Sequence, residues 1–209
     1  MPHNKQEAGL RTVVSDLVHR ACAQGMLISS FGSFSTRLEE DDFLVTPRDM
    51  KCRDVVPGEL VRVREGCGES GKRPSRTALV YREIYRANPG VNTIISARPP
   101  NLMAFAVAGI KPNVRTIPES WLFLRDMPLA DFGMPYGDTA GFVRLFGPDH
   151  PLVLVANDAV FVSGEQPLET FDRLEVAEFT ARSLLISRPL GDLSLISDEQ
   201  VEDLQQKFF

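Results

Sequence analysis

Histidine, cysteine and tryptophan are scarce in this chain, and the scarcity limits the chemistry it can perform. Its 209 residues include three histidines, three cysteines and one tryptophan. The cysteines, Cys22, Cys52 and Cys67, are odd in number and lack the close spacing of zinc-binding motifs. They therefore predict no metal site, and we expect a reduced protein of the cytoplasm in which Cys22 belongs to the core.

Long apolar runs and a surplus of positive charge are also missing. No apolar stretch approaches the roughly 20 residues that a helix needs to cross a bilayer. The first residues, MPHNKQEAGLR, lack the apolar centre of a secretory signal. The net charge is -5, from 23 basic and 28 acidic residues. Since no region is strongly basic, we expect neither a nucleic acid nor a membrane as the partner.

What is present is an alternation of helical and strand patterns without repeats or low-complexity segments. Apolar residues at helical spacing predict helices over 7–24, 76–87, 101–108, 168–187 and 197–208. Alternating apolar residues predict a hairpin of strands over 26–38 and 41–47, then strands over 59–65, 92–97, 152–157 and 159–164. This order favours an α/β fold of the α+β type, with a central, mostly antiparallel sheet flanked by helices. No linker divides it, so we expect a single domain over 1–209.

Short motifs in this chain resemble those of the class II aldolase/adducin family, over nearly its whole length. They lie in the segments GSFSTR, FLVTP, GKRPSRTALVYREIYRANPGVNTIISARPP, MPYGDT and VLVANDAVFVSG. The residues that agree with the family pattern are Gly32, Ser35, Arg37, Thr46, Pro47, Pro74, Ser75, Pro99, Pro100, Pro135, Tyr136 and Asn157. The resemblance implies the fold of that family.

The resemblance also implies a divalent metal, usually zinc, which three histidines hold and which polarises a carbonyl during carbon–carbon bond cleavage. In this sequence the positions of those histidines are occupied by Ser96, Arg98 and Asp158. A guanidinium has no lone pair to offer a metal and stays charged at any working pH. The composition therefore excludes a three-histidine metal site of this kind, and we expect no metal and no cofactor.

The histidines of the chain cannot replace the missing ligands. His3 lies near the start, and His19 lies on the first predicted helix. His150 precedes a predicted strand whose far end carries Asp158, about 25 Å away at the rise of an extended chain. Three histidines therefore do not converge anywhere in the predicted fold.

The other polar positions of the family pattern are changed as well. The catalytic glutamate is replaced by Thr77, a histidine by Tyr81, an asparagine by Ser33 and a glycine by Asp49. Losing the base and the ligands together favours a chain that has lost carbon–carbon lyase activity. The candidate ligand-binding residues are Arg98, Ser96, Arg76, Thr77, Asp158, Tyr81 and Ser33.

Arg98 has two interpretations. It can form a structural ion pair with Asp158, its neighbour in the family pattern. Alternatively, its planar guanidinium can bind an anionic small molecule such as a sugar phosphate or a carboxylate. Both remain open at the level of the sequence.

Two functions follow, with a third, less favoured one. The chain is a non-catalytic binding or assembly subunit, or it is a metal-independent lyase, isomerase or decarboxylase with a rebuilt cleft. The third is a lyase that takes metal ligands from a partner subunit. The resemblance implies a homo-oligomer, a tetramer in many members, or assembly with an intact relative. Trp121, Leu122, Phe123 and Leu124 are candidates for either the core or a contact surface. We favour the core, because aromatic residues at helical spacing usually point inward.

Overall fold

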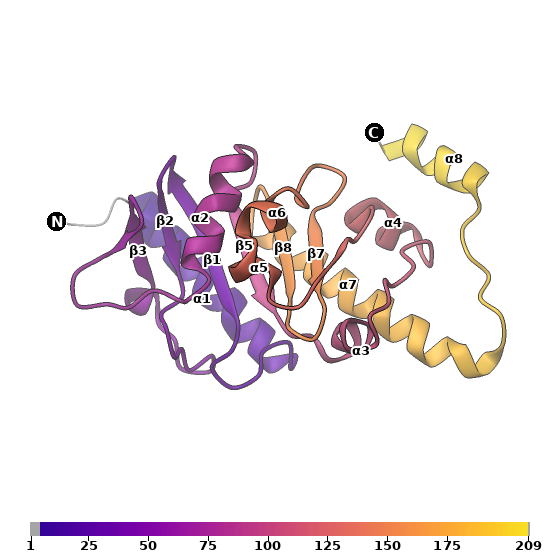
Figure 1. Ribbon diagram of the computed structural model, residues 1–209, viewed down its shortest axis with the longest axis horizontal. Coiled ribbons are helices and arrows are strands. Elements are labelled where there is room, and N and C mark those ends of the chain that lie inside the picture. Colours follow the sequence, from indigo (N-terminus) through magenta and orange to yellow (C-terminus); the bar gives the residue numbers. More distant parts are fainter. Residues whose placement is uncertain (1–4, 209) are drawn as a thin grey trace.

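The computed structural model describes residues 5–208 and is built around one eight-stranded sheet (Figure 1). The strands are β1 Ser33–Glu39, β2 Asp42–Val45, β3 Val61–Arg64, β4 Cys67–Gly68, β5 Thr93–Ala97, β6 Leu129–Ala130, β7 Leu152–Val155 and β8 Val160–Gly164. Their order across the sheet is β4-β3-β2-β1-β5-β8-β7-β6. Only β6 and β7 pair in parallel, so the predicted α/β class with a mostly antiparallel sheet is confirmed.

Helices lie on both faces of this sheet (Figure 1). They are α1 Lys5–Ala23, α2 Ala78–Ala87, α3 Pro100–Ala108, α4 Pro118–Leu124, α5 Met134–Gly137, α6 Thr139–Val143, α7 Pro167–Ser187 and α8 Asp198–Phe208. One apolar cluster joins α1, α3 and α7 to one face, and a second joins α2 and α6 to the other. All five predicted helices are present. No helix is predicted at α5 and α6, and at α4 the sequence shows only a few aromatic residues at helical spacing.

The central strand β5 shows how the sheet separates the two clusters. Successive side chains of a strand point to opposite faces, and Ile95 belongs to the cluster of α1 while Ile94 belongs to that of α2. Ser96 shares the face of Ile94 and is 2 % exposed. Ser96, near the end of a strand that helices cover on both faces, is therefore directed toward α2, where the candidate site lies.

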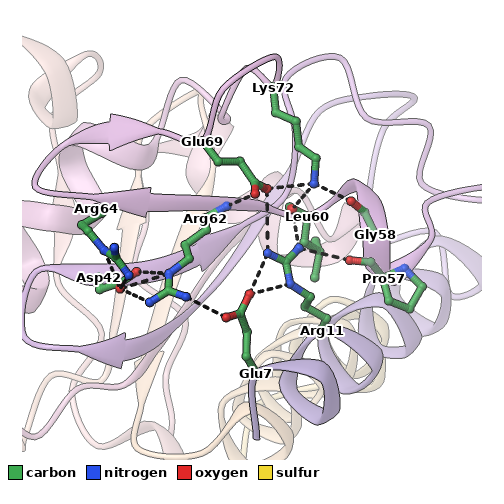
Figure 2. A network of polar contacts seen from close by, with 10 residues as sticks. All are labelled: Glu7, Arg11, Asp42, Pro57, Gly58, Leu60, Arg62, Arg64, Glu69 and Lys72. Carbon is green, nitrogen blue, oxygen red and sulfur yellow. Dashed lines mark hydrogen bonds and ion pairs between the residues drawn. The ribbon is translucent and has the colours of Figure 1, made fainter. Parts of the chain in front are cut away.

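Ion pairs and hydrogen bonds of charged side chains connect α1 to β2 and β3, near one edge of the sheet (Figure 2). The Arg11 guanidinium donates to Glu7 at 2.9 Å and to the carbonyl of Leu60 at 2.6 Å. Arg62 of β3 donates to Glu7 at 2.8 Å and to Asp42 of β2 at 2.9 Å. Buried ions need partners to offset their lost hydration, and each of these charges has at least two.

Two of the three cysteines are bonded to each other, so the expectation of reduced cysteines is wrong for them. Cys22 of α1 forms a disulfide with Cys52, in the segment after β2, with their Cα atoms 5.8 Å apart. Cys22 is partly buried against the core, and Cys67 is free and exposed. Packing of α1 under the segment after β2 brings together residues separated by 30 positions, which spacing alone does not reveal. Within residues 5–208 no helix combines the length and apolarity that crossing a membrane requires.

The aromatic side chains of α4 are less buried than the core position expected for them. Leu124 is buried, but Trp121 and Leu122 are only half-buried and Phe123 is exposed. The face of α4 that meets α7 carries Ser120, whose hydroxyl is hydrogen-bonded to Thr180 at 2.6 Å. The expected core position is therefore wrong for Phe123, because a short helix has room for few inward positions.

Candidate functional site

One end of the sheet gathers the predicted site residues, because neighbouring antiparallel strands start and finish there. In the register of β1 with β5, Ser33 lies opposite Ser96. The register of β5 with β8 ends at Ala97. Arg98, just after β5, therefore lies beside Asp158, which comes just before β8.

These strand ends surround a cavity of about 670 Å³. Six of the seven predicted residues line it: Ser33, Arg76, Thr77, Ser96, Arg98 and Asp158. They come from the ends of β1, β5 and β8 and from the start of α2, so they converge only in the folded chain. Their part in binding a ligand stays a prediction.

The expected ion pair between Arg98 and Asp158 is present. Nη2 of Arg98 donates to Oδ1 of Asp158 at 2.6 Å, and the two side chains are 24 % and 21 % exposed. The backbone N–H of Arg98 donates to the carbonyl of Met26 at 2.9 Å, and its guanidinium lies 6.0 Å from the centre of the Phe31 ring. Within residues 5–208 the other guanidinium nitrogens have no hydrogen-bond partner, so their N–H groups are available to the cavity.

A tight turn between β7 and β8 places Asp158 at the cavity. The N–H of Val155 donates to the carbonyl of Ala159 at 2.8 Å and closes the turn. Asn157 inside it has a φ of 55°, a left-handed conformation that asparagine adopts more readily than most residues. Asn157 is one of the residues that agree with the family pattern, and its conformation gives a backbone reason for that agreement.

Two further backbone features shape the cavity. Gly32 has a φ of 137°, and a Cβ atom there would lie 2.4 Å from Leu27 and 3.3 Å from the carbonyl oxygen of Ser96. Only glycine therefore allows β1 to start this close to β5. Asp49 has a φ of 60°, so the backbone conformation that suits the family's glycine persists although the side chain has changed.

Tyr81 lies behind the wall of the cavity, which corrects the expectation that it lines the site. It is 0 % exposed, and its hydroxyl donates to the carbonyl oxygen of Ser33 at 3.0 Å. Burial raises the pKa of Tyr81 to about 12, against smaller opposing contributions from hydrogen bonds with Thr77, Ser33 and Ser96. The neutral phenol therefore holds the floor in place and does not reach a ligand.

The start of α2 presents hydroxyl groups to the cavity. The hydroxyls of Thr77 and Ser75 are hydrogen-bonded to each other at 2.9 Å. Thr77 is the residue just before α2, where the free N–H groups and dipole of a helix favour an anion. A threonine hydroxyl does not act as a carboxylate base at neutral pH, so Thr77 cannot take over the role of a catalytic glutamate.

Several residues of the cavity were not predicted, including Phe31, Arg48, Leu79 and Tyr136. Partial burial and then the charge of Asp158 raise the pKa of Tyr136, so its phenol stays protonated near neutral pH. Tyr136 agrees with the family motif, which was a signal that could have found it. Phe31 and Arg48 lie in loops and Leu79 lies on α2, and no sequence pattern marks any of the three as part of a site.

The charged groups of the cavity leave one net positive charge, since Arg48, Arg76 and Arg98 face Asp49 and Asp158. The side chains of Arg48 and Arg76 are exposed, and neither forms an ion pair in the part of the chain that the structure describes. Two arginines are thus free to meet an anion, in addition to the unused donors of Arg98.

Residues 13–185 match the family model described as the Class II Aldolase and Adducin N-terminal domain. The chain belongs to this family. A 3-oxo-tetronate 4-phosphate decarboxylase of Escherichia coli is 27% identical over 195 residues, which are 90% of each protein. Another of the same name, from Cupriavidus necator, is 29% identical over 105 residues, 50% of this chain, and the alignment spans only 48% of that relative.

The crystal structure of YgbL from Escherichia coli superimposes with a TM-score of 0.87, covering 96% of this chain and 100% of that one. The two sequences are 23% identical. At this level of identity the likeness establishes the fold of the class II aldolase and adducin family and nothing of the chemistry.

The residues at the family's metal position do not fit the metal. They offer a hydroxyl, a guanidinium without a lone pair, and one carboxylate that is already paired. In residues 5–208 no group of three or more histidine, cysteine, aspartate and glutamate side chains could hold a metal ion. His150 lies 3.6 Å from Asp126 and outside the cavity lining, His19 lies on α1, and His3 is outside the described residues.

Proposed function

We propose that this member of the class II aldolase and adducin family binds an anionic small molecule in the cavity and does not perform metal-dependent carbon–carbon cleavage. The ion pair of Arg98 with Asp158 carries the proposal. It lies at two of the three positions where the family pattern places metal ligands. A guanidinium and a divalent cation in neighbouring positions of one site would repel each other strongly. The ion pair therefore takes the place of the metal.

The chemistry of the lining supports a carboxylate or a phosphate as the group that is bound. Arg48 and Arg76 are unpaired within residues 5–208, and arginine binds both kinds of oxyanion through two parallel hydrogen bonds. The hydroxyls of Ser33, Thr77 and Ser96 add neutral donors on the floor. The substrate named for the curated relatives, a 3-oxo-tetronate 4-phosphate, carries both groups.

The experiment is a thermal unfolding series with glycerol 3-phosphate, gluconate and zinc chloride. A ligand present at about 100 times its Kd stabilises the folded state by about 2.7 kcal/mol, so the anions should raise the Tm and zinc should not. Arg76→Ala should weaken anion binding about tenfold. Arg182→Ala, which removes an exposed arginine of α7 outside the cavity, is the matched control. Stabilisation by zinc with zinc-dependent lyase activity would contradict the proposal.

A second function is favoured by the unused donors of Arg98. In the decarboxylation of a 3-oxo acid, the bond to the carboxylate breaks, carbon dioxide leaves and the electron pair passes to the 3-oxo oxygen. A proton then adds to the carbon. A fixed cation beside that oxygen would stabilise the developing charge without a metal. Release of carbon dioxide from a 3-oxo acid in the presence of a chelator, lost in Arg98→Ala, would select this function over binding alone.

A further inference from the structure

Part of the cavity lining is apolar. A small anion bound by the arginines alone would leave this apolar part exposed to solvent. Leu79, Tyr136 and Phe31 line the cavity and are 68 %, 56 % and 49 % exposed. Large apolar groups that gather at a hollow and face solvent usually mark a site that something else covers. The covering group must fit a cavity that also carries arginine side chains.

The three apolar side chains come from separate parts of the chain. Leu79 is the second residue of α2, Phe31 lies in the turn before β1, and Tyr136 belongs to α5. The guanidinium of Arg98 lies 6.0 Å from the centre of the Phe31 ring, so charge and apolar surface adjoin at this point. A ligand that reaches Arg98 with its acid group therefore has apolar surface close to its remaining atoms.

We infer that the ligand is an acid with a flat, apolar body, in the class of aromatic carboxylates, and is not a polyhydroxylated sugar. This rests on the proposed function, because the same arginines would hold its carboxylate. An aromatic ring that covers Leu79 and Phe31 removes apolar surface from water on both partners. The hydroxyls of a sugar turned toward the same surface would lose their hydrogen bonds to water.

The volume of the cavity is compatible with this class of ligand. Cavities that bind small organic molecules commonly hold several hundred cubic ångströms and combine apolar walls with a few placed polar groups. This one has a volume of about 670 Å³, with Leu79 and Phe31 as walls and Arg76 and Arg98 as placed charges. A ring system with one carboxylate uses both parts of the lining.

The test compares two monocarboxylates by calorimetric titration: 2-naphthoate, which has an apolar body, and gluconate, which has a hydroxylated one. The parent protein should bind 2-naphthoate at least about tenfold more tightly. Leu79→Gln should reduce that affinity about tenfold and change gluconate binding by less than about twofold. Leu168→Gln, the same substitution at a leucine of α7 that is 53 % exposed and outside the cavity, should change neither.

The outcomes separate this inference from the proposed function. Equal affinities, or binding of gluconate alone, would overturn the aromatic class and leave anion binding intact; absence of binding by either compound and by glycerol 3-phosphate would overturn both. Phe31→Ser supplies a second variant should Leu79→Gln unfold. An unchanged 2-naphthoate affinity in Leu79→Gln, with a lower mass by light scattering, would assign the apolar surface to a second copy of the chain and overturn the inference.

Discussion

At the scale of single residues, the ion pair of Arg98 with Asp158 decides how the rest of the cavity is understood. Each side chain is about three-quarters buried or more, so removing one charge leaves the other poorly hydrated. Arg98→Ala should lower the free energy of unfolding by about 1–3 kcal/mol, measured by urea titration. The double variant Arg98→Ala with Asp158→Ala should recover part of this loss, because no unpaired carboxylate remains.

The opposite result would give Arg98 a different role. If Arg98→Ala were as stable as the parent or more so, and had lost its stabilisation by glycerol 3-phosphate, the arginine would be held for a ligand at some cost in stability. Arg53→Ala, which removes an exposed arginine outside the cavity, is the control for a general effect of charge.

Six of the seven site residues predicted from the sequence line the cavity, but most of its other lining residues were not predicted. Motif order placed Ser96, Arg98 and Asp158 together, and strand register in the structure accounts for their proximity. Tyr81 was wrongly expected at the surface of the cavity, because burial depends on how α2 packs on the sheet. Leu79 could not be predicted as part of the lining for the same reason.

At the scale of elements, the buried charges between α1, β2 and β3 make stability depend on pH (Figure 2). Burial alone would raise the pKa of Asp42, but hydrogen bonds from Arg62 and Arg64 outweigh it and hold the pKa below its usual range. At Glu69, burial alone would likewise raise the pKa, but the hydrogen bonds from the Lys72 side chain and the Arg62 backbone outweigh it and hold the pKa below its usual range. Both carboxylates therefore bind fewer protons when folded than when unfolded, and the stability they contribute is lost as the pH falls through and below about 4.

We expect the free energy of unfolding to decrease between about pH 5 and pH 3 in urea titrations. Asp42→Asn should be less stable by about 1–3 kcal/mol at pH 7 and should depend less steeply on pH in that range. Asp16→Asn, at an exposed position of α1, should follow the curve of the parent. An acid limb in Asp42→Asn as steep as in the parent would show that these ion pairs do not set the dependence.

The length of an element decided how well the sequence predicted it. Ser197 and Gln200 form a capping box before α8, since the N–H of Gln200 donates to the Ser197 hydroxyl at 3.2 Å and the N–H of Ser197 to the Gln200 side chain at 2.9 Å. The helices α4 to α6 have no more than seven residues, and β4 and β6 have two each. Elements this short are stabilised by contacts with the rest of the fold and carry almost no periodic signal.

At the scale of the whole molecule, the cavity and a group of exposed apolar side chains near the end of α7 lie in different regions. The cavity lies where β1, β2, β5 and β8 meet α2. The last turns of α7 and the segment beyond it lie at the opposite end of the molecule from α1. They lead to α8, which lies away from the sheet (Figure 1). Large apolar side chains are exposed in this region: Phe179, Ile186, Leu190, Leu193, Leu195 and Phe208. An apolar surface of this kind favours association.

We therefore predict that the protein forms a homo-oligomer through the region that contains the end of α7. Light scattering at micromolar concentration should give a multiple of the 23.2 kDa mass of one chain. Leu190→Glu would place a charge where 85 % of an apolar side chain is now exposed, and should weaken association by about tenfold or more. Leu168→Glu, at the other end of α7, should leave the mass unchanged, and a parent protein that elutes as a single chain would contradict the prediction.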